Sequence, residues 1–251
     1  MNTLTRTFRF IAFTLTEYAR SGRILIELLA SVVFFYLFLW RWTAQPDYFF
    51  STAGLFALGL TFSTISAMQS LGDRPQGYLI LVRRLGRGAY LLGLYLAAIL
   101  IVLAMYALIS LAVTLLHRID GLDVRTWLLG SLPLLLNVAL LGALLTLLAP
   151  MVLTAGWRLG ILALVAIAFS GNLLGGPAMA QLGPLANVLD VLRTIFSTPL
   201  LPAFTGFALS VTRDYSVLSL AILLAQFSLT LSLLALAVYS FARRELIFSG
   251  S

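Results

Sequence analysis

The sequence predicts an all-α integral membrane protein with six transmembrane helices, and two observations lead to this fold class. Of the 251 residues, 61% are hydrophobic and only 10% are charged, whereas soluble domains are about 45–50% apolar and about 25% charged. The apolar residues also form six stretches that approach or exceed the roughly 20 residues needed to cross a bilayer. We therefore expect lipid to surround most of the chain, which forms a single transmembrane domain over residues 1–251.

The six predicted spans cover residues 24–42, 49–71, 89–116, 127–150, 157–176 and 216–241. Their centres are almost free of the acidic groups that proton- or sodium-driven transporters are expected to keep at the midplane, so secondary transport is disfavoured. Glu27 is the nearest case. Because it lies one helical turn from Arg23, we expect a local ion pair near the inner interface.

The distribution of charge predicts the orientation. All sixteen basic residues are Arg; with the N-terminus inside, eleven fall in cytoplasmic segments and five in outer segments, where aspartates offset them. Because an excess of basic residues marks the cytoplasmic side, both termini are expected to be cytoplasmic. The arginines are divided among short loops and form no continuous basic face, so nucleic acid is not expected as a partner.

Residues 3–20 predict an amphipathic helix rather than a span. Apolar side chains recur at spacings of four and three, whereas Glu17 and the arginines lie on other sides; the apolar positions are Leu4, Phe8, Ile11, Leu15 and Tyr18. This pattern is typical of a helix lying flat in the membrane interface, and the alternative is a surface helix packed on protein. We expect this segment to be retained, because no convincing signal-peptide cleavage site follows the apolar run that starts at Ile24.

Residues 177–215 are unusual because they contain four prolines and an amphipathic piece over residues 187–196. Non-helical backbone at membrane depth must be shielded by protein or face a water-filled cavity. We therefore expect short re-entrant or surface helices on the outer side before the last span. A plain extracellular loop is the alternative.

Residues 73–85 predict a capped cytoplasmic helix between the second and third spans. Asp73 suits an N-cap with Gln76 three residues on, Pro75 suits a first turn, and arginines complement the helix dipole in the last turn. A simple positive-inside loop, which would need arginines but no capped helix, is the alternative. The residues expected to dock a partner are Asp73, Arg74, Gln76, Tyr78, Leu81, Val82, Arg83, Arg84 and Arg87.

The chain offers few groups for catalysis. It contains no Cys and no Lys, so thiol chemistry and the lysine-containing loop that cradles nucleotide phosphates are excluded. With one His, a zinc site lacks ligands. We therefore expect no catalytic, cofactor-binding or metal-binding residue in this chain, and any ATP that drives it must be bound by another chain.

At this point the pattern resembles the permease subunit of ABC-2-type ATP-binding cassette exporters. The resemblance covers the whole chain and is most specific over residues 73–93, where Asp73-Arg74-Pro75-Gln76-Gly77 and Arg87-Gly88-Ala89-Tyr90-Leu91-Leu92-Gly93 are similar to the family's run. The sequence departs from that run at Leu85-Gly86, where a proline-containing turn is usual, and at Leu94, where lysine is usual.

The resemblance implies several partners. These are a second permease chain, identical or paralogous, and an ATPase subunit docked below each permease chain, which binds ATP and Mg. Residues 73–85 would be the coupling helix, which fits into a cleft of that ATPase. The complex would lie in the cytoplasmic membrane of a bacterium or an archaeon. The competing interpretation is a non-transport scaffold or assembly factor that recruits a cytoplasmic protein through its Arg-rich loop.

Overall fold

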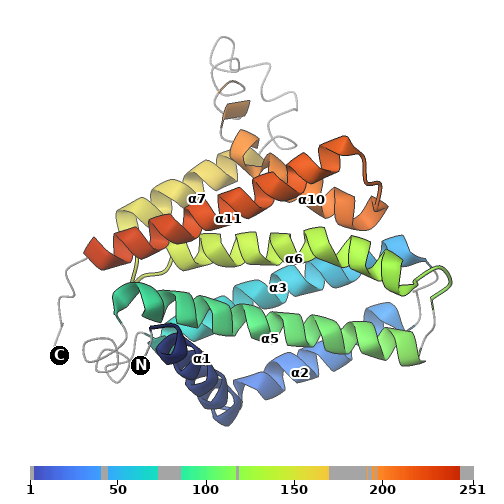
Figure 1. Ribbon diagram of the computed structural model, residues 1–251, viewed down its shortest axis with the longest axis horizontal. Helices are drawn as coiled ribbons and strands as arrows, with labels where there is room; N and C mark the ends of the chain where they lie inside the picture. The colour runs from blue at the N-terminus through green and yellow to red at the C-terminus, as the bar shows by residue number, and fades with distance from the viewer. Residues whose placement is uncertain are drawn as a thin grey trace, which may run out of the picture.

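The computed structural model describes residues 3–40, 45–72, 86–116, 119–169, 191, 194–195 and 197–243. All regular secondary structure within these residues is helical, which confirms the all-α class. The long helices lie side by side, and α1 crosses one end of the bundle (Figure 1). The helices are α1 (Thr3–Arg20), α2 (Arg23–Phe34), η1 (Phe35–Leu39, a π-helix), α3 (Pro46–Gly72), α5 (Arg87–Leu116), α6 (Val124–Leu147), α7 (Ala155–Phe169), η4 (Thr198–Leu200, a 3-10 helix), α10 (Leu201–Thr212) and α11 (Val217–Arg243).

Four of the described helices, α3, α5, α6 and α11, are long and apolar enough to cross a membrane. A fifth candidate arises if α1 and the continuous helix Arg23–Leu39, which comprises α2 and η1, are counted as one broken span. The axes of these two helices are bent by 72°. The described part of α7 has 15 residues, so the predicted span 157–176 runs beyond the described residues. These lengths are consistent with a multi-pass membrane protein, and the full count of six stays a prediction.

The bundle exposes many large apolar side chains and buries several polar ones within its apolar core. Large aliphatic residues such as Leu29, Leu111 and Leu224 are more than half exposed, whereas Thr61 and Thr64 are fully buried. The buried Thr61 hydroxyl donates to the carbonyl of Ala57 at 2.7 Å, so it needs no partner outside its own helix. An apolar exterior around hydrogen-bonded polar groups is expected where lipid surrounds the protein.

The core is built mainly by α3, α5 and α6. Aromatic side chains fill one end of it, where Phe49, Phe50 and Tyr106 pack together and the Tyr106 hydroxyl lies 2.8 Å from the Ser131 hydroxyl. Gly130 allows this packing, because a Cβ atom there would lie 2.3 Å from the Phe50 ring. Small residues that let helices approach closely are typical of packing in membranes.

Pro133 lies inside α6 and cannot donate a hydrogen bond to the carbonyl of Leu129. The hydroxyl of Tyr215, in the turn between α10 and α11, donates to this carbonyl at 2.7 Å. The freed backbone acceptor is therefore satisfied by another part of the chain, as membrane helices with proline require.

The short helix α10 lies within the bundle, against α3, α6 and α11. Phe207 reaches Gly54 of α3, and Gly206 lies against Gln226 of α11. The helix ends at Arg213, whose positive φ of 55° reverses the chain into α11. Helix α10 falls within the stretch 177–215 and precedes α11. Its placement as an outer re-entrant or surface helix stays a prediction, and much of the stretch lies outside the described residues.

Candidate functional site

One end of the bundle gathers helix ends that the chain separates widely. The ring of Phe10 in α1 lies 5.1 Å from the ring of Tyr90 in α5 and covers Gly93. Arg87, at the first position of α5, donates to the carbonyl of Ala242 near the end of α11 at 2.9 Å. The turn between α6 and α7 contributes Met151 to the same cluster. We call this region the α1 end (Figure 1).

The predicted docking segment is attached to the α1 end. Gly72 ends α3 and Gly86 precedes α5. Asp73, Arg74, Gln76, Tyr78, Leu81, Val82, Arg83 and Arg84 lie between these glycines and outside the described residues. The only described member of the predicted set, Arg87, belongs to α5 itself rather than to a separate helix.

Helix α1 rests on the bundle through one face. Ile11 and Tyr18 are buried, Leu15 is partly buried, and Glu17 pairs with Arg20 at 3.9 Å on the exposed face. Phe8, predicted to share the apolar stripe, is 69% exposed, and nothing is described of the Leu4 side chain. The buried face also takes in Phe10 and Thr14, so it contacts protein, and the placement of α1 in a membrane interface stays a prediction.

A carboxylate joins α1, α2 and α3 beside this face. Glu27 is 4% exposed, and its Oε1 accepts hydrogen bonds of 2.6 Å from the hydroxyls of Tyr18 and Thr64. Its Oε2 is buried with no hydrogen-bond partner among the described residues.

The expected ion pair between Glu27 and Arg23 is wrong. Arg23 instead donates to the carbonyl of Ala67 at 2.9 Å and to the Ser70 hydroxyl at 3.2 Å. The two residues lie within one helical turn, but each has a partner on another helix. Glu27 accepts from hydroxyls of α1 and α3, and Arg23 donates to the end of α3. Glu27 therefore ties three helices together rather than neutralising a local charge.

The opposite end of the bundle carries most of the described aspartates. Asp47 pairs with Arg213, which joins the start of α3 to the end of α10. Asp123 caps α6 by accepting a 2.7 Å hydrogen bond from the backbone amide of Thr126. Hydrogen bonds from the Thr126 side chain and backbone lower the pKa of Asp123, so this cap is charged near neutral pH.

A second buried polar group links α6 to α11 midway along the bundle. The Gln226 amide donates to Oδ1 of Asn137 at 2.8 Å, and these residues are 0% and 4% exposed. Gly206 of α10 makes room for this contact, because a Cβ atom there would lie 2.0 Å from the Gln226 amide nitrogen. The Asn137 Nδ2 has no partner among the described residues.

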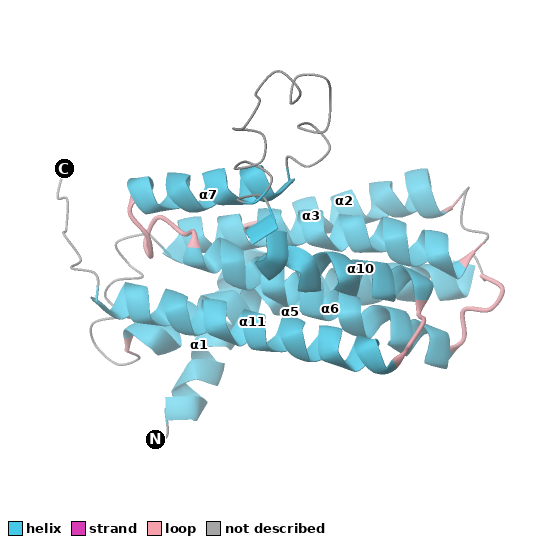
Figure 2. Cartoon of the chain, turned by 90° about the horizontal axis from the view of Figure 1, so that it is seen from above, coloured by secondary structure: helices cyan, strands magenta, loops and turns pink. Residues whose placement is uncertain are grey.

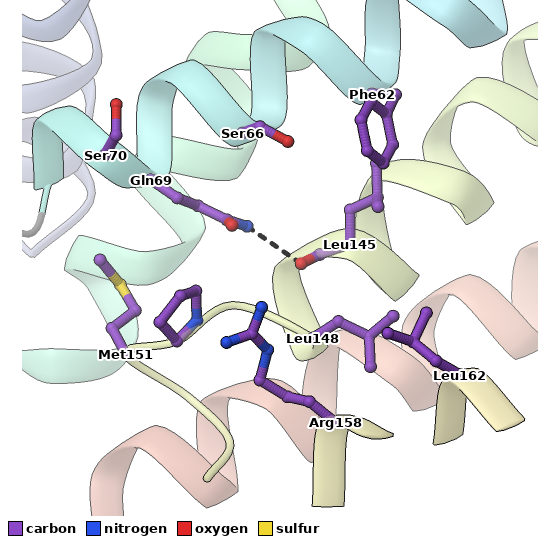
Figure 3. Close-up of a pocket in the computed structure, with 10 residues that line it drawn as sticks. Phe62, Ser66, Gln69, Ser70, Leu145, Leu148, Met151, Arg158 and Leu162 are labelled. Atoms are coloured by element: carbon purple, nitrogen blue, oxygen red, sulfur yellow. Dashed lines mark hydrogen bonds between the residues drawn. The ribbon is translucent and has the colours of Figure 1, made fainter. Parts of the chain in front are cut away.

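Two cavities lie between α7 and the rest of the bundle. One, near the α1 end, has a volume of about 480 Å3 and is lined by residues that include Ser66, Gln69 and Arg158 (Figure 3). The other has a volume of about 630 Å3, and Asn137 is the one polar residue among its described lining residues. Ligand pockets in proteins typically measure about 300–1,000 Å3, so each cavity is large enough for a small molecule.

Sequence reasoning missed the Asn137–Gln226 contact and both cavities. A signal for the first was present, because Asn137 and Gln226 are polar residues within apolar spans. The cavities had no such signal, because spans that are apolar all round do not reveal which face meets a neighbour.

Comparison with known proteins yields no match: no family model, no curated protein and no solved structure is similar to this chain.

Proposed function

We propose that this chain is the permease subunit of an ATP-binding cassette exporter, driven by a separate ATPase subunit. The observation that carries the proposal is the construction of the α1 end. The Arg-rich segment 73–85 connects α3 directly to α5, and α1 is braced on α5 through Phe10 and on α3 through the Glu27 contacts. A force applied to this segment would therefore move α3, α5 and α1 together.

In this proposal α2 with η1, and α7 with the residues after it, are the two further spans, and α10 is a re-entrant helix on the outer side. Both termini are cytoplasmic, in a bacterial or archaeal cytoplasmic membrane. A second permease chain, identical or paralogous, packs at α3 and α7. Support for this contact comes from α7, on which Trp157 and Leu159 are about 70% exposed and packing against the described helices is sparse.

The ATPase subunits bind ATP and Mg, and their closure pushes the segment 73–85. Rigid-body rotation and small helix shifts are the movements that packed helices can make in response. The Glu27 and Phe10 contacts of α1 are the features that make the α1 end move as a unit.

Co-purification tests the proposal. The tagged chain is co-expressed with candidate ATP-binding cassette ATPases of the same genome, and the ATPase recovered from solubilised membranes is measured. The double variant Arg83→Glu with Arg84→Glu is expected to lower recovery by about tenfold or more, because like charges facing each other across an interface cost several kcal/mol.

The matched control reverses two arginines of the predicted outer loop, Arg118→Glu with Arg125→Glu, and is expected to leave recovery unchanged. If the unaltered chain recovers no ATPase, the exporter proposal is wrong. Recovery of a cytoplasmic protein that is not an ATPase would favour the scaffold alternative instead.

A further inference from the structure

The two cavities follow one another along the same three helices. On α3, Leu55 and Leu58 line the larger cavity, and Phe62 and Gln69 line the smaller one. On α6, which runs in the opposite direction, the larger cavity is lined by Asn137, Leu140, Leu141 and Leu144, and the smaller one by Leu145 together with Leu148 just after the helix. We call the two cavities together, lined on the third side by α7, the α7 groove. Figure 2 labels the three helices α3, α6 and α7.

The α7 groove is as long as a lipid chain. Leu55 and Gln69 lie fourteen residues apart on α3, and a helix rises about 1.5 Å per residue, so the groove extends over about 21 Å. The hydrocarbon core of a bilayer is about 30 Å thick, so one leaflet is about 15 Å thick. The groove is therefore long enough for one acyl chain and the linkage to its headgroup.

The two ends of the α7 groove differ in polarity. At the α1 end, Arg158 points from α7 toward Gln69 and the carbonyl of Leu145 (Figure 3). At the other end the described lining residues are aliphatic and aromatic apart from Asn137. This gradient from a cation to hydrocarbon matches an amphiphile lying along the groove with its headgroup at the α1 end.

Arg158 has no counter-ion within the part of the chain that the structure describes. Among the described residues, its buried Nε has no hydrogen-bond partner, and the smaller cavity is lined by no carboxylate. The amide of Gln69 is already engaged, because it donates to the carbonyl of Leu145 at 3.1 Å. A guanidinium at the polar end of an apolar groove, whose buried Nε has no acceptor among the described residues, is suited to a phosphate group.

We propose that the α7 groove binds one anionic phospholipid of the surrounding bilayer, with its phosphate on Arg158 and one acyl chain along α3 and α6. Positively charged pockets between membrane helices are a recognised setting for anionic lipid headgroups. The groove lies within one chain, so this binding requires no ATPase and does not depend on the proposed function.

Native mass spectrometry of the purified, delipidated full chain in a neutral detergent tests the proposal. The probes are dioleoyl phosphatidylglycerol, dioleoyl phosphatidylcholine with the same chains, and glycerol 3-phosphate, which has the phosphate without chains. The unaltered chain is expected to bind phosphatidylglycerol about tenfold more tightly than phosphatidylcholine, a difference of about 1.4 kcal/mol. Glycerol 3-phosphate in excess is expected not to displace the bound lipid.

Variants locate the binding. Arg158→Gln is expected to abolish the preference for phosphatidylglycerol, whereas Arg158→Lys, which keeps the charge, preserves most of it. The matched control, Arg125→Gln, removes one charge at the opposite end of the bundle and is expected to leave the preference unchanged. Ser66→Trp fills the polar end of the groove and is expected to lower the binding of both lipids.

Four results would overturn the proposal. An unchanged preference in Arg158→Gln would place the phosphate elsewhere, displacement by glycerol 3-phosphate would indicate a simple anion site, and an equal effect of Arg125→Gln would indicate binding by net charge. The fourth is unaltered lipid binding in Ser66→Trp. If Arg158→Gln fails to fold, the Ser66→Trp variant and the two control measurements still decide the matter. Lipid binding without any recovered ATPase would contradict the proposed function and leave the lipid site standing.

Discussion

At the scale of single residues, Glu27 is the clearest example of a side chain whose role depends on its neighbours. Its Oε1 receives two hydroxyl donors from different helices, and Oε2 receives none among the described residues. A buried charge is costly unless hydrogen bonds compensate it, so each donor to this carboxylate matters more than a donor at the surface. The hydroxyl of Tyr18 is one of these donors, and it anchors α1.

We expect Tyr18→Phe to destabilise the protein by about 1–3 kcal/mol, because it leaves a buried acceptor with one donor fewer. The thermal unfolding midpoint in detergent measures this effect. Tyr239→Phe is the matched control, since Tyr239 is 53% exposed and contacts Arg243 through its ring, which phenylalanine keeps. Equal midpoints for Tyr18→Phe and the unaltered chain would show that the Tyr18 hydroxyl does not stabilise the fold.

At the scale of elements, glycines determine how closely helices approach. Gly93 lies under the ring of Phe10, and a Cβ atom there would lie 2.5 Å from a ring carbon, so α1 can rest on α5 only because residue 93 has no side chain. Gly59 of α3, by contrast, has no atom within 4 Å of the corresponding position. The two glycines therefore separate the effect of close packing from the effect of helix propensity.

Gly93→Leu is expected to displace α1 from α5, because the new side chain needs the space that the Phe10 ring fills. Hydrogen exchange of the backbone amides in residues 3–20 measures this, and exchange about tenfold faster corresponds to about 1.4 kcal/mol less protection. Gly59→Leu, which adds the same side chain facing open space, is expected to leave this exchange unchanged. Unaltered exchange in Gly93→Leu would mean that α1 is held by other contacts.

At the scale of the whole molecule, the two ends of the bundle have different charge. The α1 end includes Arg87 and Arg158, whereas the opposite end carries Asp47 paired with Arg213 and the capping Asp123. Arginine counting predicts that the α1 end faces the cytoplasm, and this orientation stays a prediction. Successive loops lie on opposite sides of the membrane only if each of the six predicted spans crosses it.

Labelling of single cysteines with a membrane-impermeant maleimide tests the six crossings. The chain has no cysteine of its own, so each introduced thiol reports alone. Ser21→Cys and Thr154→Cys are expected to react from the cytoplasmic side, and Gln45→Cys and Asp214→Cys from the outer side. If the thiols at residues 21 and 45 react from the same side, α2 with η1 does not cross the membrane. If the thiols at residues 154 and 214 react from the same side, the segment that contains α7 does not cross an odd number of times.

The sequence predicted the all-α class and the approximate positions of the helices, because long apolar runs leave few alternatives to a helix in lipid. The predicted span 89–116 corresponds to Arg87–Leu116, and 127–150 to Val124–Leu147. The candidate site was predicted less completely. Arg87 proved to be part of α5, the other predicted docking residues lie outside the described part, and Phe8 is exposed.

Composition by itself therefore predicted helices long and apolar enough to cross a membrane, and the described part of the chain contains four of them. Only the tertiary structure decided which polar groups meet. Glu27 contacts a hydroxyl 37 residues away, and Asn137 and Gln226 are 89 residues apart. The physical reason is that lipid-facing and protein-facing sides of these helices are both apolar, so periodicity cannot distinguish them, whereas the few buried polar groups must find partners wherever the packing brings them.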